Sequence, residues 1–461
     1  MSQRLSRLLG AVLVATLVAL FPSVPASAAT TKIMIVGDSI SQGAEGDYTW
    51  RYRFAQHLAS SGVAADFVGP WTGTRVLDAD HANPMVSHSG AYRPGISFDS
   101  ANLAQWGWRM DQAKDVIGAN VSGHTPDYLL VELGFNDLGW GVSDAPGLIS
   151  HFETFVANAR AAKPNIRIVI GNVPHRTPLD VNPGLPALIS QYNALLAARV
   201  PQLSTSASPI VLADIDGPFN ENTDTYDGLH PNVRGEYVIA KAFADRVSGS
   251  FGLGGAYGAI PTSLPAGLTP AAPTSITAVR VADKLKVSWS HSFGATGYQF
   301  WKRDVTTGGA WEKGLYEIGA DSWTDDWLPA GHRMEYQVRA TRGSSWTSPA
   351  SPTASAVVRP MPDVPNVTVV ANPDRPYTLT VRWSAVADAH DYHVYAAPGC
   401  DSTVPAPSAF TEQQWGLAGK TSWTQELVFE QCRNYKVVAS RWGGHGSLAT
   451  ATTVRAYPYR T

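Results

Sequence analysis

Four short apolar runs, separated by helical patterns, constrain most strongly what this chain can fold into. The runs lack alternation with polar residues, and each is followed by turn residues. Strands of this kind are buried on both faces, as in a parallel sheet that helices cover on each side. The runs extend over Lys32 to Val36, Tyr128 to Leu133, Ile166 to Ile170 and Ile210 to Ala213.

Amphipathic helix patterns lie between and after these runs. Trp50, Phe54 and Leu58 recur at positions i, i+4 and i+8, which places them on one helix face. Alternation of strands and helices predicts that residues 30–250 form an α/β domain with a doubly wound, flavodoxin-like parallel sheet. Ligands of such domains bind beyond the C-terminal ends of the strands. The other helix patterns extend over Leu148 to Ala162, Pro186 to Ala198 and Arg234 to Val247.

Composition limits the partners and the number of domains. A chain of 461 residues corresponds to about three domains. Its formal net charge of −3 gives no electrostatic reason to expect nucleic acid or an anionic membrane as a partner. With only two cysteines, a scaffold of several disulfides and a cysteine-ligated structural zinc are both excluded.

The N-terminal residues 1–28 have the pattern of a signal peptide. Arg4 and Arg7 precede the apolar run from Leu8 to Phe21, which is too short to span a bilayer. Ala26-Ser27-Ala28 then supplies the small residues that signal peptidases cleave after. We therefore expect a secreted, extracellular protein without an integral membrane segment in the mature chain; a buried N-terminal helix is the alternative.

Secretion would place the two cysteines, Cys400 and Cys432, in an oxidising compartment. We expect them to form one structural disulfide, with two free thiols as the alternative. Closing a loop of about 33 residues would stabilise the fold by about 3–4 kcal/mol in the chain-entropy model.

Residues 251–272 are rich in glycine and proline, and this composition predicts a linker that is partly flexible and partly extended. The glycines follow no strand and open no helix, so they are not a dinucleotide-binding fingerprint.

The C-terminal part contains a repeat with an offset of 94–100 residues. Trp289 is followed nine residues later by Tyr298, as Trp383 is by Tyr392. Further on, Trp323 matches Trp423, and the late strand Tyr336-Gln-Val-Arg-Ala340 matches Tyr435-Lys-Val-Val-Ala439. The offset is the size of one β-sandwich. The two units, residues 273–360 and 361–461, resemble fibronectin type III domains. We expect their tryptophans to be core residues rather than platforms for sugar stacking. The domains themselves would contact a polymer or a surface, or only act as spacers.

Three short motifs carry candidate catalytic residues. Two of them follow predicted strands, and the third precedes the last predicted helix. Gly37-Asp38-Ser39-Ile40 follows the first run, so Ser39 would project at the C-terminal edge of the sheet, although serine also commonly caps helices. Asn136 follows the Tyr128–Leu133 run; an asparagine there can face Ser39 or merely close a turn. In Asp227-Gly228-Leu229-His230, the carboxylate can accept from imidazole Nδ1 and leave Nε2 to take a proton from a serine.

Together these segments resemble the SGNH, or Gly-Asp-Ser-Leu (GDSL)-type, serine hydrolases, with Ile40 in place of leucine. The resemblance covers residues 30–250 and the order of all three motifs. It implies that Ser39 is the nucleophile, His230 the general base and acid, and Asp227 the residue that orients His230. It also implies an oxyanion hole formed by the Ser39 N–H, the Asn136 side chain and a glycine N–H.

Two glycines are candidates for the third donor of the oxyanion hole. Trp106-Gly107-Trp108 resembles the Gly-Trp segment of acetylxylan-esterase-like members of the family, and His88-Ser89-Gly90 has a similar pattern. Gly107 is the preferred assignment and Gly90 the alternative.

The resemblance implies ester hydrolysis through an acyl-enzyme, without a metal or an organic cofactor. Neither Gly-x-Ser-x-Gly nor His-Glu-x-x-His occurs in the chain, which argues against an α/β-hydrolase elbow and a zinc protease. The acidic segment from Asp214 to Asp224 has Gly217 at the wrong position for an EF-hand, so we expect a solvated loop.

Likeness around Asp80-His81 and Gly107-Trp108 to carbohydrate-esterase members favours acetyl esters on a polysaccharide such as xylan. Trp106, Trp108 and Trp140 would line a sugar-binding cleft or pack in the core. A lipase or esterase acting on fatty-acyl esters is the enzymatic alternative. An extracellular binding or adhesion protein with a catalytically silent hydrolase domain is the alternative of another class.

Overall fold

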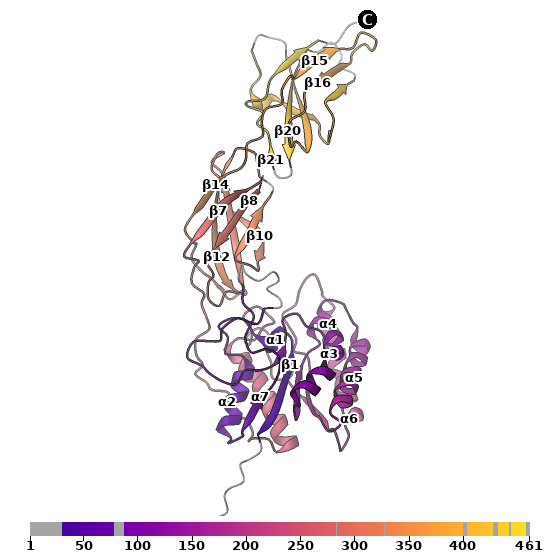
Figure 1. Ribbon diagram of the computed structural model, residues 1–461, viewed down its shortest axis with the longest axis vertical. Coiled ribbons are helices and arrows are strands. Elements are labelled where there is room, and N and C mark those ends of the chain that lie inside the picture. Colours follow the sequence, from indigo (N-terminus) through magenta and orange to yellow (C-terminus); the bar gives the residue numbers. More distant parts are fainter. Residues whose placement is uncertain are drawn as a thin grey trace, which may run out of the picture.

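The computed structural model describes residues 30–77, 87–282, 284–326, 328–399, 403–426, 432–441 and 444–457. It shows an α/β domain at one end, followed by two β-sandwiches in a row (Figure 1). The predicted signal peptide, the Asp80-His81 pair and Cys400 lie outside the described residues. The pairing of Cys400 with Cys432 therefore stays a prediction.

The first domain is built on a parallel sheet with the strand order β2-β1-β4-β5-β6, and β3 pairs with β1 beyond the end of β2. This order confirms the doubly wound α/β fold. The strands are β1 (Thr31–Gly37), β2 (Ala65–Phe67), β3 (Leu103–Ala104), β4 (Tyr128–Glu132), β5 (Arg167–Gly171) and β6 (Ile210–Ala213).

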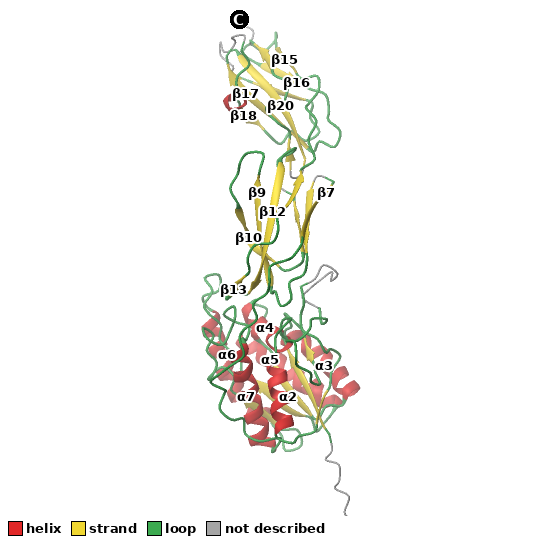
Figure 2. Ribbon diagram, turned by 90° about the vertical axis from the view of Figure 1, so that its left-hand side faces the viewer, coloured by secondary structure: helices red, strands yellow, loops and turns green. Residues whose placement is uncertain are grey.

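Helices cover both faces of this sheet. On one face α3 packs against α5 and α5 against α6, and on the other α2 packs against α7 (Figures 1 and 2). The helices are α1 (Ser39–Gln42), α2 (Trp50–Ser60), α3 (Met110–His124), α4 (Phe135–Gly139), α5 (Ala145–Ala162), α6 (Leu185–Leu203) and α7 (Val233–Phe251). Among the described residues, none of the helices has both the length and the apolar character needed to cross a membrane.

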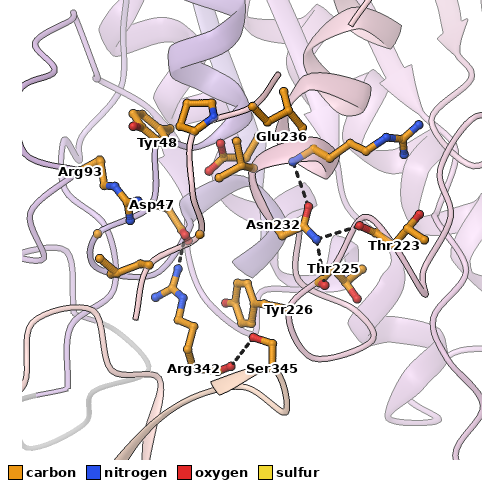
Figure 3. Close-up of a pocket in the computed structure, with 17 residues that line it drawn as sticks. Asp47, Tyr48, Arg93, Thr223, Thr225, Tyr226, Asn232, Glu236, Arg342 and Ser345 are labelled. Atoms are coloured by element: carbon orange, nitrogen blue, oxygen red, sulfur yellow. Dashed lines mark hydrogen bonds and ion pairs between the residues drawn. The ribbon is translucent and has the colours of Figure 1, made fainter. Parts of the chain in front are cut away.

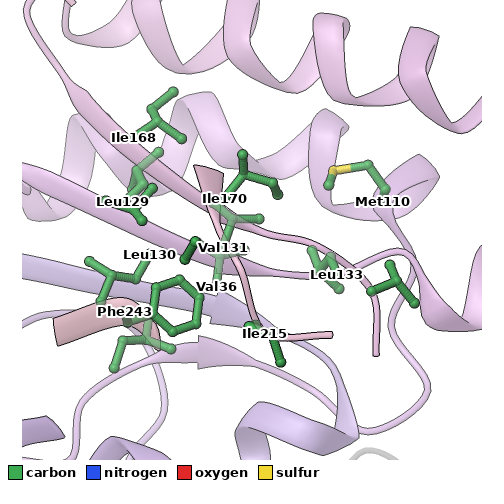
Figure 4. Packing of buried hydrophobic residues seen from close by; sticks show 14 of the residues in the cluster. Val36, Met110, Leu129, Leu130, Val131, Leu133, Ile168, Ile170, Ile215 and Phe243 are labelled. Carbon is green, nitrogen blue, oxygen red and sulfur yellow. The ribbon is translucent and has the colours of Figure 1, made fainter. Parts of the chain in front are cut away.

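The apolar runs form the core of this domain, as their pattern predicts. Val36, Val131 and Ile170 come from three neighbouring strands and are completely buried, with Phe243 of α7 and Met110 of α3 packed near them (Figure 4). Full burial of one such aliphatic side chain contributes about 1.5–3 kcal/mol. A rigid sheet of this kind fixes the positions of the loops at its C-terminal edge.

The first β-sandwich consists of one sheet with the order β10-β9-β12-β13, in which β14 also pairs with β12, and a second sheet β11-β8-β7. Its strands are β7 (Ile276–Val281), β8 (Lys284–Trp289), β9 (Gly297–Asp304), β10 (Glu312–Ile318), β11 (Ser322–Asp325), β12 (Arg333–Arg342), β13 (Trp346–Thr347) and β14 (Ala354–Val357).

The second β-sandwich repeats this arrangement, with the sheets β18-β17-β20-β21, where β22 pairs with β20, and β15-β16-β19. The elements are β15 (Thr368–Ala371), β16 (Leu379–Arg382), β17 (Asp391–Pro398), the 3₁₀ helix η2 (Pro407–Ala409), β18 (Thr411–Gln414), β19 (Ser422–Gln425), β20 (Arg433–Arg441), β21 (Gly444–His445) and β22 (Val454–Ala456). Every strand pair of both sandwiches is antiparallel, so the all-β prediction is confirmed.

The repeated aromatic pairs lie in the cores of the two sandwiches. Trp289 packs against Tyr298 with ring centroids 5.3 Å apart, and Trp383 packs against Tyr392 at 5.5 Å. All four side chains are buried. Trp289 and Trp383 therefore stabilise the sandwiches, but the expectation fails for Trp323, Trp346 and Trp415 of the same domains, which are exposed.

The Gly- and Pro-rich segment 251–272 follows the surface of the first domain. Tyr257 N donates to Asp245 (2.7 Å), and the Tyr257 carbonyl accepts from Lys241 Nζ (2.9 Å). Further along, the Ala266 carbonyl accepts from the Arg93 guanidinium. These bonds hold much of the segment against the α/β domain.

Candidate active site

Ser39 lies at the sharp turn between β1 and α1. Asp38 caps the short helix through a hydrogen bond from Ile40 N to its Oδ1 (2.9 Å). At Gly37 a β-carbon would clash with the Ser41 side chain and lie 3.0 Å from the Glu132 carbonyl, so only glycine fits this tight turn. The turn thus places Ser39 at the C-terminal edge of the sheet, as the sequence predicts.

His230 and Asp227 stand in the loop between β6 and α7. His230 Nε2 is 2.9 Å from Ser39 Oγ, and His230 Nδ1 is 2.6 Å from Asp227 Oδ2. Asp227 Oδ1 also accepts from the backbone N–H groups of Leu229 (3.0 Å) and His230 (2.8 Å). The structure therefore brings the three predicted residues into one hydrogen-bonded chain.

Asp227 remains ionised throughout the physiological pH range. Burial alone would raise the pKa of Asp227, but the adjacent His230 and the two backbone donors outweigh it and lower this pKa to about 2. A fixed carboxylate of this kind keeps the proton of a neutral imidazole on Nδ1. Nε2 is then the nitrogen that accepts the Ser39 proton.

Asn136, in the first turn of α4, faces the same site. Its Nδ2 donates to the Trp108 carbonyl (2.9 Å) and, through a longer bond, to Asp38 Oδ2 (3.2 Å). The side chain thus links the nucleophile turn to the segment around Trp108. Because both amide protons are engaged, a substrate oxyanion would compete with Asp38 for one of them.

The two candidate oxyanion glycines differ in their hydrogen bonds. Gly90 N already donates to the Thr74 carbonyl at 2.9 Å. The Gly107 segment is instead fixed beside the nucleophile turn, because Gln105 N donates to the Gly37 carbonyl (3.1 Å) and Trp106 N to Gln42 Oε1 (2.7 Å). This geometry favours Gly107 over Gly90 as the third donor.

Aromatic rings flank the imidazole of His230. The Trp106 ring stacks on it at 4.4 Å between centroids, and the Tyr226 ring is nearly parallel to it at 5.8 Å. A guanidinium lies over each of these rings. Arg75 Cζ is 4.3 Å from the centroid of the Trp106 ring, and Arg342 Cζ is 4.6 Å from the centroid of the Tyr226 ring.

Sequence reasoning missed Tyr226, Arg75 and Arg342. Tyr226 directly precedes the Asp-x-x-His motif, so its place near His230 could have been inferred from proximity in the chain. Arg342 ends β12 of the first β-sandwich and carries no local signal of its position.

The three tryptophans considered for a sugar cleft have different locations. Trp106 borders the site, whereas Trp108 is buried in the domain core. Trp140 is 54% exposed just after α4. The Trp106 ring therefore stacks on His230, whereas Trp108 touches the site through its carbonyl, which accepts from Asn136.

Two carboxylates are buried at the nucleophile turn: Asp38 within it and Glu132 at the end of β4. Burial raises the pKa of Glu132 to about 7, and Glu132 accepts a hydrogen bond from Ser41 Oγ (2.9 Å). Burial and the proximity of Glu132 raise the pKa of Asp38 well above its usual value. Like charges this close disfavour ionisation of both carboxyl groups.

Two cavities adjoin the site. One, of about 340 Å³, is bordered by Trp106 and Asp227. The other, of about 440 Å³, is bordered by Tyr226, Glu236 and Arg342, and the bond between Arg342 and Asp47 lies at its edge (Figure 3). Only the first cavity is bordered by a residue of the Ser39–His230–Asp227 chain. Within the described residues, no cluster of side chains is suited to hold a metal ion.

The chain is similar to known ester hydrolases. Residues 35–238 match the GDSL-like Lipase/Acylhydrolase family. A multidomain esterase of Ruminococcus flavefaciens is 24% identical over 238 residues, which are 50% of this chain and 30% of that protein. The chain thus spans about a third of the length of that relative.

Solved structures similar to the chain include an acetyl esterase mutant with acetate ion. It is 24% identical, covers 47% of this chain and 96% of its own, and has a TM-score of 0.39. A carbohydrate esterase of family 3 from Talaromyces cellulolyticus is 25% identical with the same coverage and TM-score.

Proposed function

We propose that the chain is a serine esterase that hydrolyses carboxylic esters through an acyl-enzyme; residues 35–238, which contain its site, match the GDSL-like Lipase/Acylhydrolase family. The observation that carries this proposal is the hydrogen-bonded chain from Ser39 Oγ through His230 to Asp227. This arrangement activates a serine hydroxyl in many unrelated hydrolases.

In the proposed first half-reaction, Ser39 Oγ attacks the ester carbonyl carbon while His230 Nε2 takes its proton. The Ser39 and Gly107 N–H groups and Asn136 Nδ2 stabilise the oxyanion that forms. The tetrahedral adduct then collapses, its bond to the alkoxide breaks, and His230 donates its proton to the leaving alcohol. The acyl group remains on Ser39.

In the second half-reaction, His230 takes a proton from water as the water oxygen attacks the acyl carbon. Collapse of this adduct breaks the bond to Ser39 Oγ, which recovers its proton from His230. The products are a carboxylic acid and the free enzyme. Asp227 stays ionised in both steps and stabilises the imidazolium.

The proposed substrates are short-chain, chiefly acetyl, esters of a polysaccharide. The cavity beside Asp227 supports this choice, because its border contains Arg75, Thr296, Glu317 and Ser344. Polar groups of this kind suit an alcohol with many hydroxyl groups better than an alkyl chain.

Hydrolysis of p-nitrophenyl esters from acetyl to palmitoyl tests the activity and the acyl preference together. We expect highest kcat/KM for acetate, no turnover by Ser39→Ala, and unchanged turnover by Ser206→Ala, an exposed serine at the opposite edge of the sheet. A palmitate optimum would make the enzyme a lipase. Full activity of Ser39→Ala would refute the nucleophile, and inactivity of the wild type on every ester would favour a binding protein.

Labelling with a fluorophosphonate tests the covalent intermediate independently of the substrate. A fluorophosphonate adduct on the peptide that contains Ser39, and its loss in Ser39→Ala, would support an acyl-enzyme. A wild-type enzyme that hydrolyses esters but forms no adduct would contradict it.

Secretion is part of the same proposal, supported by the basic, apolar and small-residue regions of residues 1–28. We expect the exported protein to begin at Ala29, as N-terminal sequencing would show. In that compartment Cys400 and Cys432 would be bonded, and the intact mass should rise by two hydrogens on reduction.

A further inference from the structure

The first β-sandwich is docked on the loops that carry the candidate catalytic residues. Arg342, at the end of β12, is buried and donates through Nη1 to the Glu45 carbonyl (3.0 Å), and through Nη2 to the Asp47 carboxylate. Ser345 N donates to the Tyr226 carbonyl (3.2 Å). The turn after β12 is therefore bonded to both the Glu45–Asp47 loop and the loop of His230.

A second set of contacts fixes the other side of this interface. Glu45 is 7% exposed, and its Oε2 accepts from His291 Nε2 (2.6 Å) and from Gly294 N (2.9 Å). His291 Nδ1 in turn is 3.1 Å from Asp321. Charged groups buried at an interface are costly unless they are paired, so this pairing holds the two domains in one defined orientation.

At Gly343 the turn after β12 packs directly against the loop that carries Asp227 and His230. Its φ is +50°, and a β-carbon at this position would lie 2.5 Å from Asp227 Cβ and 2.6 Å from the Tyr226 carbonyl. Real β-carbon contacts are longer, so the sandwich approaches Asp227 as closely as a backbone without a side chain permits. The position therefore requires glycine both for conformation and for space.

The cavity of about 340 Å³ beside Trp106 and Asp227 is bordered by both domains. The α/β domain also contributes Arg75, and the first sandwich contributes Thr296, Glu317 and Ser344, together with Gly343. A hydrolase domain alone would leave this side of the site open to solvent.

We propose that the first β-sandwich forms one wall of the substrate cleft, and that Glu317 selects esters whose alcohol part carries several hydroxyl groups. This inference rests on the proposed esterase function and adds to it a specificity-determining residue from outside the hydrolase fold. Glu317 is exposed at the end of β10, and its carboxylate can accept hydrogen bonds from two hydroxyl groups.

Gly343→Ala tests whether the first β-sandwich forms this wall, because Gly343 is the point at which the sandwich contacts Asp227. The added methyl must displace the turn or Asp227, and a misplacement near 1 Å lowers rates by up to about 10²-fold. We expect kcat/KM of the full-length variant to fall by at least about 10-fold on p-nitrophenyl acetate and on acetylated xylo-oligosaccharide. The matched control is Gly308→Ala in the same sandwich, with φ +71° and no atom within 4 Å of the added carbon.

Glu317→Gln tests specificity without adding bulk. Loss of charge-assisted hydrogen bonds should lower kcat/KM on the oligosaccharide about 10-fold more than on p-nitrophenyl acetate, whose alcohol carries no further hydroxyl. Glu312→Gln, an exposed glutamate at the start of the same strand, is the control and should leave the ratio of the two substrates unchanged.

The outcomes separate this inference from the proposed function. If the wild type hydrolyses both esters through Ser39 but Gly343→Ala behaves as Gly308→Ala, the wall is refuted and the esterase stands. Equal losses on both substrates in Glu317→Gln would refute the specificity role. Absence of hydrolysis in the wild type would overturn the proposed function itself. If Gly343→Ala fails to fold, the ratio of kcat/KM on the two substrates in Glu317→Gln decides whether the sandwich contributes to specificity.

Discussion

Replacing Asp227 with asparagine exchanges one side-chain oxygen of the candidate catalytic chain for an amide nitrogen and tests how Asp227 sets the protonation of His230. In the wild type, Asp227 Oδ2 accepts from His230 Nδ1 at 2.6 Å, while Oδ1 accepts from two backbone N–H groups. The amide oxygen of asparagine would keep the backbone bonds, which turns its NH₂ group toward Nδ1. Nδ1 must then act as acceptor, so the imidazole proton moves to Nε2.

The expected magnitude follows from this change of tautomer. Nε2 carrying a proton cannot take one from Ser39, and the same substitution in a serine protease triad lowers kcat by about 10⁴-fold. That loss corresponds to about 5.5 kcal/mol of transition-state stabilisation. The variant also loses the stability linked to the pKa of Asp227, which is about 2 in the fold against a usual 3.8. This difference amounts to about 2 kcal/mol.

Because the pKa of Asp227 is lowered by folding, its contribution to stability is present above pH 3.8 and is lost as the pH falls through about 2. Turnover of p-nitrophenyl acetate and urea unfolding at pH 7 measure the two effects separately. The control is Asp216→Asn, because Asp216 makes a similar contact with His175 (2.7 Å) that is not linked to Ser39. This control should lose stability but keep its kcat. A wild-type kcat in Asp227→Asn would refute the reasoning.

Two further predictions concern the oxyanion hole and the domain interface. Asn136→Ala should lower kcat by about 10²–10³-fold, and a change confined to KM in steady-state kinetics would contradict an oxyanion role. Burial opposes the charge of His291, but Asp321 and Glu45 outweigh it and raise the pKa of His291 to about 10. The stabilising effect of His291 is therefore complete below pH 6.5 and is lost as the pH rises through about 10. The thermal unfolding midpoint should therefore fall over this range, and His291→Gln should lack that fall; an equal slope in both proteins would disprove the coupling.

The parts of the fold that the sequence predicts are those set by local patterns. The buried strands carry continuous apolar runs, and the observed β1, β4, β5 and β6 differ from the predicted ranges by a residue or so at their ends. Ser39, Asn136 and the Asp227–His230 pair could be placed together because parallel strands end at one edge. Their proximity follows from topology.

Other elements carry weaker signals. β2 and β3 contain only three and two residues, too few for a recognisable period. The prediction ended α6 at Ala198, but the helix continues to Leu203 with Pro201 inside it. Proline costs a helix most in its interior, and so close to the C-terminus the missing N–H removes a single bond.

Contacts between the domains could not be predicted at all. Arg342 is nearly 300 residues from its partner Asp47, and a buried arginine on a sandwich strand has the same local pattern as an exposed one. The composition of segment 251–272 predicted a partly flexible connection, whereas specific bonds from residues such as Asp245 and Arg93 hold it in place. Such bonds depend on the tertiary structure.

The contact between Gly343 and Asp227 also has a consequence for the order in which the parts of the cleft form. The α/β domain is complete once α7 ends at Phe251, but the turn after β12 emerges about 90 residues later. In the proposed enzyme, a folded α/β domain therefore lacks the last side of its cleft, and the proposed selection of the alcohol part requires that the neighbouring domain has also folded.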